Sequence, residues 1–132
     1  MKKQPFVILG LIAFVCLGVA AMRPPQQRYK NLKVLPQDIT QRQMDSIMNS
    51  YNVALGVKCQ FCHSPLKSAP WLKDSLDYAS DDLPMKEEGR KMIRMNIEIN
   101  KNWFNYKNDP RPEYLTSVTC NTCHKGEAYP EH

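Results

Sequence analysis

Apolar side chains recur every three or four residues over residues 37–56, which is the spacing of one face of an α-helix. The apolar positions are Met44, Ile47, Met48, Tyr51 and Leu55. Asp38 or Thr40 can accept hydrogen bonds at the start of such a helix, and Gly56 suits its C-terminal cap. The pattern therefore predicts a first helix that ends three residues before Cys59.

A second helical pattern covers residues 84–106. Met85, Met92, Ile99 and Tyr106 lie seven residues apart, with Gly89, Met95, Asn96 and Trp103 beside them. Pro84 suits a first helical turn, and the acidic Asp81 and Asp82 just before it suit the positive end of the helix dipole. A proline-rich loop then leads to Cys120.

The segment between the two helices, residues 64–80, is predicted to be a long irregular connection. Pro65 and Pro70 interrupt it. No strand pattern precedes Lys58 or Thr119 either, so the expected fold class is all-α.

The N-terminal stretch has the layout of an export signal. Two lysines precede an almost unbroken apolar run over residues 6–22, and small residues at its end form a cleavage site before Met22. The run is also close to the length that spans a bilayer, so a retained anchor is an equal alternative. Residues 1–22 are expected to be a signal peptide or membrane anchor, and residues 23–132 one exported domain. Cys16 lies in the leader, which leaves four cysteines in that domain.

The sequence Cys-x-x-Cys-His occurs twice in the exported part, at residues 59–63 and 120–124. The chain has three histidines, and two of them directly follow such a cysteine pair. This pattern is typical of c-type haem attachment, in which two sulfurs bond to the haem and the adjacent imidazole binds its iron. The motifs therefore predict two covalently bound haem c groups. The attaching residues are Cys59, Cys62 and His63 in the first motif and Cys120, Cys123 and His124 in the second.

Other uses of paired cysteines explain the sequence less well. Four cysteines in an exported chain can form two disulfides, but a disulfide needs no adjacent histidine. A thioredoxin-like redox pair needs a strand–turn–helix setting that is missing from the pattern. A zinc site made of all four cysteines needs pairs that lie closer than the 61 residues from Cys59 to Cys120, and it leaves both histidines unused.

Each haem iron needs a second axial ligand, and the thioether of methionine is a common one. His132 is the histidine outside the motifs, but it is the last residue, where chains usually fray. Apart from Met1 and Met22, the methionines lie on the two predicted helices, at Met44, Met48, Met85, Met92 and Met95. Core packing gives the same helical spacing. The spacing leaves Met44 against Met48, and Met92 against Met95.

Four stretches carry a further signal: NLKVLPQDI, MNSYNVALGVKCQFCH, KEEGRKMIRMNIEIN and VTCNTCHKGEAYP. From about Asn31 to Pro130 the chain thereby resembles the cytochrome c subunit of photosynthetic reaction centres. The resemblance implies haems that lie alongside helices carrying methionine ligands. Matched residue by residue, it places these ligands on Met48 for the first haem and Met92 for the second. Gly89, one turn before Met92, stands where the resemblance implies a small residue beside a flat haem.

The chain departs from the family in one large respect. The family is typically tetrahaem, whereas this sequence has two attachment motifs and no histidine between Met95 and Cys120. The resemblance therefore implies a short, two-haem relative. We expect a small all-α dihaem cytochrome c, built from two helix–turn–CxxCH units with long irregular loops.

Charge adds little to this interpretation. The formal net charge is +5, and removing Lys2 and Lys3 leaves 16 basic and 13 acidic residues, or +3. Haem propionates would offset this excess, and an exported protein does not meet nucleic acid, so no nucleic-acid partner is expected. Lys86, Arg90 and Arg94 recur every four residues and predict a solvated helix face, with a propionate clamp or a docking patch as the alternative.

The expected function is one-electron transfer without catalytic residues, since the haem iron does the redox chemistry and the protein sets its ligands and burial. The expected partner is a redox protein or a membrane electron-transfer complex at the periplasmic side of the cytoplasmic membrane. The membrane itself becomes a partner if residues 1–22 are retained. The alternative is a haem enzyme, such as a peroxidase, with one open iron, which two methionine ligands argue against.

Overall fold

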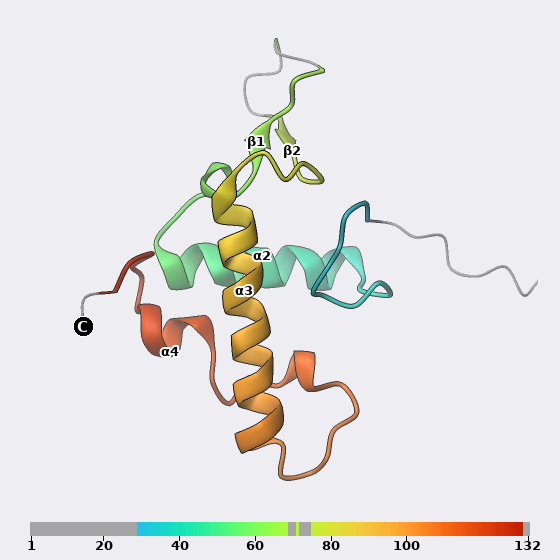
Figure 1. Ribbon diagram of the computed structural model, residues 1–132, viewed down its shortest axis with the longest axis vertical. Helices are drawn as coiled ribbons and strands as arrows, with labels where there is room; N and C mark the ends of the chain where they lie inside the picture. The colour runs from blue at the N-terminus through green and yellow to red at the C-terminus, as the bar shows by residue number, and fades with distance from the viewer. Residues whose placement is uncertain (1–28, 69–70, 72–74, 131–132) are drawn as a thin grey trace, which may run out of the picture.

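The computed structural model describes residues 29–68, 71 and 75–130 (Figure 1). The predicted leader, residues 1–22, lies outside these residues, as does His132. In chain order the elements are α2 (Gln41–Leu55), a 3-10 turn (Cys59–Phe61), β1 (Ser64–Pro65), β2 (Leu76–Asp77), α3 (Pro84–Ile99), a π-helical turn (Asn100–Phe104), a second 3-10 turn (Pro112–Tyr114) and α4 (Cys120–His124). No helix in the described part of the chain has the length and apolar character needed to cross a membrane.

Helix α2 confirms the first predicted helix and its two caps. Thr40 is the N-cap, and its hydroxyl accepts a hydrogen bond from the Gln43 backbone N–H at 3.3 Å, while the Gln43 side chain accepts from the Thr40 N–H at 3.0 Å. This reciprocal pair is a capping box. Asp38, the other candidate cap, pairs instead with Arg111 at 3.2 Å. Gly56 ends the helix in the left-handed conformation, with φ of 63°.

The second predicted helix is present as α3, which begins with Pro84 in its first turn. Regular α-helix ends at Ile99, and the π-helical turn carries the helical path to Phe104, close to the predicted end. Figure 1 shows α2 and α3 running in different directions, with the short α4 near one end of α2.

The connection over residues 64–80 is more regular than predicted. Ser64 pairs with Asp77 and Pro65 with Leu76 in an antiparallel ladder, and the Leu66 N–H donates to the Ser75 carbonyl at 2.9 Å. The all-α prediction missed this small sheet because two-residue strands are too short to show an alternating pattern. The sheet folds the connection into a hairpin beside the start of α3 (Figure 1).

A fully buried asparagine fixes the approach to the second motif. Asn100 has no exposed surface. Its side-chain amide donates to the Val118 carbonyl at 2.8 Å, and its side-chain oxygen accepts from the Val118 N–H at 2.9 Å. Asn96 adds a second donor to the Val118 carbonyl at 3.0 Å. Both backbone groups of Val118, two positions before Cys120, are thereby bound to the last turn of α3 and the π-helical turn that follows it.

Few apolar side chains are fully buried. Among the described residues, the buried apolar side chains are Leu35, Ile39 and Ala54. Large exposed apolar side chains include Val53, Trp71, Tyr78, Met92, Met95, Trp103, Tyr106 and Tyr129. A chain of this size normally buries a larger apolar core. This surface is therefore suited to covering large apolar groups.

Two glycines allow the segment after the second motif to pack against the end of α2. Gly56 and Gly126 both have positive φ, and the Gly126 N–H donates to the Ala54 carbonyl at 2.8 Å. A Cβ atom at Gly56 would collide with the backbone carbonyl of Gly126, whereas a Cβ at Gly126 would meet nothing within 4 Å. Close backbone contact is possible only because Gly56 has no side chain.

We expect Gly56→Ala to destabilise the haem-loaded protein more than Gly126→Ala does. Both alanines would lie at positive φ, which costs roughly 1–2 kcal/mol. At Gly56 the collision with the Gly126 backbone adds roughly 1–3 kcal/mol of overpacking. The free energies of unfolding in urea provide the measurement. Equal losses for the two variants would show that the collision with the Gly126 backbone adds nothing to the cost of a side chain at Gly56.

Candidate functional site

The first motif directly follows the turn that ends α2. Cys59 begins a 3-10 turn, and the His63 N–H donates to the Cys59 carbonyl at 3.0 Å. Both thiols of the motif are half-buried. The Asn52 side chain lies 3.6 Å from the Cys59 sulfur, and the Cys62 sulfur lies 3.8 Å from the Met85 carbonyl. The end of α2 and the start of α3 therefore position the two sulfurs.

Burial favours the neutral form of the first motif's imidazole. His63 lies edge-on to the Tyr78 ring, with 5.0 Å between ring centroids. Burial lowers the pKa of His63, and the cationic Lys86 and Arg90 lower it further. Neutral imidazole is the form that binds a metal. Burial likewise raises the pKa of Cys62, and Lys86 opposes this effect.

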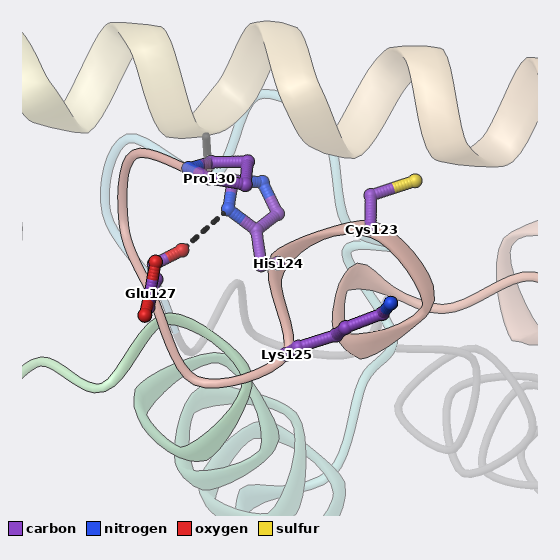
Figure 2. Close-up of a pocket in the computed structure, with 5 residues that line it drawn as sticks. All are labelled: Cys123, His124, Lys125, Glu127 and Pro130. Atoms are coloured by element: carbon purple, nitrogen blue, oxygen red, sulfur yellow. Dashed lines mark hydrogen bonds between the residues drawn. The ribbon is translucent and has the colours of Figure 1, made fainter. Parts of the chain in front are cut away.

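The second motif forms the short helix α4. Thr119 caps it through a reciprocal bond with Thr122, and Lys125 and Gly126 end it with positive φ. The Nδ1 atom of His124 lies 2.9 Å from the Glu127 carbonyl oxygen (Figure 2). Because a carbonyl can only accept, Nδ1 carries the proton in this contact, and Nε2 presents its lone pair to a metal.

A pocket of about 400 Å3 lies at the second motif. Its lining residues are Cys123, His124, Lys125, Glu127 and Pro130. Figure 2 shows the Cys123 sulfur and the His124 ring projecting from the same helix, with the Pro130 ring next to the imidazole. Cys123 is exposed, whereas burial raises the pKa of Cys120 and also that of the nearby Tyr51 of α2.

The four motif cysteines are free thiols in this structure. Within residues 29–68, 71 and 75–130, no group of three or more His, Cys, Asp or Glu side chains is placed to hold a metal ion. The cysteines therefore do not gather into the four-ligand arrangement that a structural zinc site needs.

The chemistry of each motif fits a covalently bound haem c. Each supplies two unpaired thiols and an adjacent imidazole, and at His124 the hydrogen bond leaves Nε2 available for iron. The small buried core and the exposed aromatic and thioether side chains provide apolar surface that a haem can cover.

The methionine ligands predicted from the family resemblance are not distinguished by the structure. Met44 and Met48 are both half-buried on α2, while Met92 and Met95 are 44% and 48% exposed on α3. Met85 has another contact, because the Tyr129 hydroxyl donates to its sulfur at 3.2 Å. Met48 and Met92 stay predictions.

The basic stripe on α3 is not the solvated face that the sequence pattern predicted. Arg90 is 7% exposed and pairs with Asp81 and Glu87, each at 2.9 Å. Lys86 is also nearly buried and pairs with Asp81 at 3.4 Å. The prediction was wrong for Lys86 and Arg90 because their acidic partners include Asp81, which folds back from the preceding loop. Arg94 alone is substantially exposed.

Several neighbours of the motifs were missed by sequence reasoning. They are Asn52 and Tyr78 at the first motif, and Tyr51 and the Glu127 carbonyl at the second. The sequence pattern places Tyr51 only on the apolar face of the helix. A backbone carbonyl and a ring from a distant loop have no sequence signal of their own.

Comparison with known proteins identifies relatives of this chain. A family model described as the photosynthetic reaction centre cytochrome C subunit matches residues 19–132. A curated photosynthetic reaction center cytochrome c subunit from Roseobacter denitrificans is 32% identical over 104 residues. The alignment covers 77% of this chain and 25% of the relative, so the chain spans about a quarter of that protein's length.

We expect Asp81→Asn to make the stability of the protein less sensitive to acid. Hydrogen bonds from Asn31 and Lys33, and then from Arg90, lower the pKa of Asp81 below its ordinary value. A carboxylate with a lowered pKa in the folded state stabilises the fold above the unfolded pKa of about 3.9, and this contribution is lost as pH falls toward the folded value. The measurement is the urea midpoint at successive pH values below about 5.

The matched control is Asp45→Asn, which removes an exposed carboxylate on α2 that bonds to Gln41 at 2.7 Å. If Asp45→Asn flattened the acid dependence as much as Asp81→Asn, the ion-pair network would not be its source.

Proposed function

Since this chain belongs to the family of photosynthetic reaction centre cytochrome c subunits, we propose that it is a dihaem c-type cytochrome that transfers single electrons. The observation that carries this proposal is the pair of motifs, each with two free thiols beside an imidazole. The haem supplies a one-electron iron couple, and the protein supplies attachment, axial ligands and burial.

Each residue of the motifs has a separate role in this proposal. Cys59 and Cys62 attach the first haem, and His63 is its axial ligand. The second motif uses Cys120, Cys123 and His124 in the same way. The Glu127 carbonyl supports this role at the second site, because its contact with Nδ1 fixes both the tautomer and the ring orientation of His124.

Met48 and Met92 are the proposed second axial ligands. The assignment rests on the residue-by-residue family match, and both side chains lie on the helices that flank the motifs. A Cβ atom added at Gly89, one turn before Met92, would meet nothing within 4 Å, which leaves this part of α3 open to a flat group. Soft thioether ligands raise the reduction potential of a haem.

Electron transfer is preferred over peroxidase-like chemistry for three reasons. The family is one of electron-transfer subunits. With histidine and methionine on each iron, no position stays open for a peroxide substrate. The exposed aromatic and thioether surface is suited to covering haem, which favours enclosed redox centres.

The proposed partner of this chain is a redox protein or a membrane electron-transfer complex. The relative's description names a reaction centre subunit, but this chain corresponds to about a quarter of that protein. We place the domain on the periplasmic side of the cytoplasmic membrane, with residues 1–22 as the export signal or anchor.

We expect two haems to stay attached after denaturation in acid. Thioether bonds survive unfolding, so mass spectrometry and haem absorbance should both give two haems per chain. Replacing Cys59 and Cys62 with serine should leave one haem. Cys16→Ser, which changes a cysteine outside both motifs, should leave two. Fewer than two haems on the unaltered denatured protein would contradict the dihaem proposal.

We expect Met48→Ala and Met92→Ala each to remove about half of the sulfur–iron charge-transfer absorbance of the oxidised protein. Each loses one of two thioether ligands, and the potential of the affected haem should fall. Met44→Ala and Met95→Ala are the matched controls, since each replaces a methionine on the same helix. Retention of the band in Met92→Ala with loss in Met95→Ala would move the second ligand to Met95.

We expect the haem-loaded domain to be soluble when residues 1–22 are removed after export. The apolar run is the proposed attachment to the membrane, and its removal leaves a chain with 16 basic and 13 acidic residues. Sedimentation of both forms with inner-membrane vesicles is the measurement. Persistent co-sedimentation of the shortened, haem-loaded protein would locate the attachment elsewhere.

A further inference from the structure

The two motif histidines differ in the surroundings of Nδ1. At the second site the Nδ1 atom of His124 lies 2.9 Å from the Glu127 carbonyl oxygen. At the first site the Nδ1 atom of His63 is buried and has no hydrogen-bond partner among the described residues. A hydrogen bond from Nδ1–H makes the opposite nitrogen a stronger donor, which stabilises ferric over ferrous iron. This effect lowers the potential at the second site and has no counterpart at the first.

Buried cations distinguish the first site further. The side chains of Lys86 and Arg90 are 10% and 8% exposed, whereas their partners Asp81 and Glu87 are 39% and 45% exposed. Water screens the exposed carboxylates more strongly than the buried cations. The electrostatic potential that this cluster produces at His63 is therefore positive. Lys86 and Arg90 accordingly both lower the pKa of this imidazole.

Lys86 also positions a ring against His63. Its ammonium donates to the Tyr78 carbonyl at 2.9 Å and to the Ser80 carbonyl. These bonds hold the loop that places Tyr78 edge-on to the imidazole.

A third carboxylate in this region belongs to Asp77. The backbone N–H groups of Ala79 and Ser80 donate to it at 3.0 Å, which offsets part of its negative charge.

The second site has a more open and more balanced environment. Cys123 is exposed, and the pocket there is lined by one basic and one acidic side chain, Lys125 and Glu127, both exposed. Opposite charges at an exposed site contribute little net field. Contact with water also favours the ferric state, which carries the larger charge.

We propose that the haem of the first motif has the higher reduction potential, so that a single electron in the protein lies mainly at the first site. This inference rests on the proposed dihaem function. The step is the transfer of one electron from ferrous iron at the second site to ferric iron at the first, and no proton or bond changes place. Lys86 acts here as a positioning residue and as a source of positive charge.

The test is a spectroelectrochemical titration of the full, haem-loaded protein with one-electron mediators. Two waves are expected, separated by at least a tenfold difference in equilibrium constant, or about 59 mV for a one-electron couple. Paramagnetic NMR of the half-reduced protein should assign them, because the His63 signals can be identified by contact with Tyr78 and the His124 signals by contact with Glu127. The first haem should be the one that is reduced.

Charge variants provide the second part of the test. Lys86→Met should shift the higher wave to a lower potential and leave the lower wave unchanged, and Lys86→Arg should restore the higher wave. Lys91→Met removes the same charge from an exposed position on α3 that pairs with Glu88 at 2.7 Å, and it should move neither wave.

Coincident waves, or a first haem that is reduced last, would overturn the inference. Equal shifts in Lys86→Met and Lys91→Met would overturn the role of Lys86. If Lys86→Met does not fold, the NMR assignment of the unaltered protein decides the order of potentials. Fewer than two covalent haems would instead overturn the proposed function, so the two failures are distinguishable.

Discussion

The backbone contact between the end of α2 and the turn after α4 is the constraint on which the arrangement of the two motifs depends. The Gly126 N–H donates to the Ala54 carbonyl at 2.8 Å, and the absence of a side chain at Gly56 lets the two backbones meet. Because Gly56 lies just before the first motif and Gly126 just after the second, one contact joins both attachment sites. The edge-on pair of Phe61 and Tyr129, at 6.4 Å between centroids, joins them a second time. The proposed electron exchange between two haems would depend on this proximity.

Buried polar side chains fix the arrangement of the loops, as an apolar core does in most domains. Asn100 binds both backbone groups of Val118, and Arg90 donates to the Asn31 carbonyl at 3.2 Å while pairing with Asp81. Both side chains are buried, and they join loop segments to α3 and to the π-helical turn that follows it. Buried polar groups are costly unless satisfied, so these contacts specify one arrangement of the loops. They leave much of the apolar surface of the helices available for haem.

Local features were predictable from the sequence because their physical causes are local. Thr40, Gly56 and Pro84 mark helix ends through bonds and backbone angles within a few residues, and all three lie at the expected positions. The Cys-x-x-Cys-His spacing alone predicts the motif residues. What could not be predicted depends on partners far along the chain. The burial of Arg90 requires Asp81 and Asn31. The ladder between residues 64–65 and 76–77 requires a chain reversal, which the periodic pattern of apolar residues does not predict.

The two motifs therefore illustrate how far a sequence repeat determines function. Their five-residue patterns are equivalent, and on sequence alone the two proposed haem sites are interchangeable. The structure makes them different through groups outside the motifs: a carbonyl three residues after His124, and a ring and two cations from a loop and helix beside His63. A family relationship transfers attachment chemistry, because that chemistry is contained in the motif. It does not transfer the potential of each haem, because potential depends on hydrogen bonding, burial and charge supplied by the whole fold.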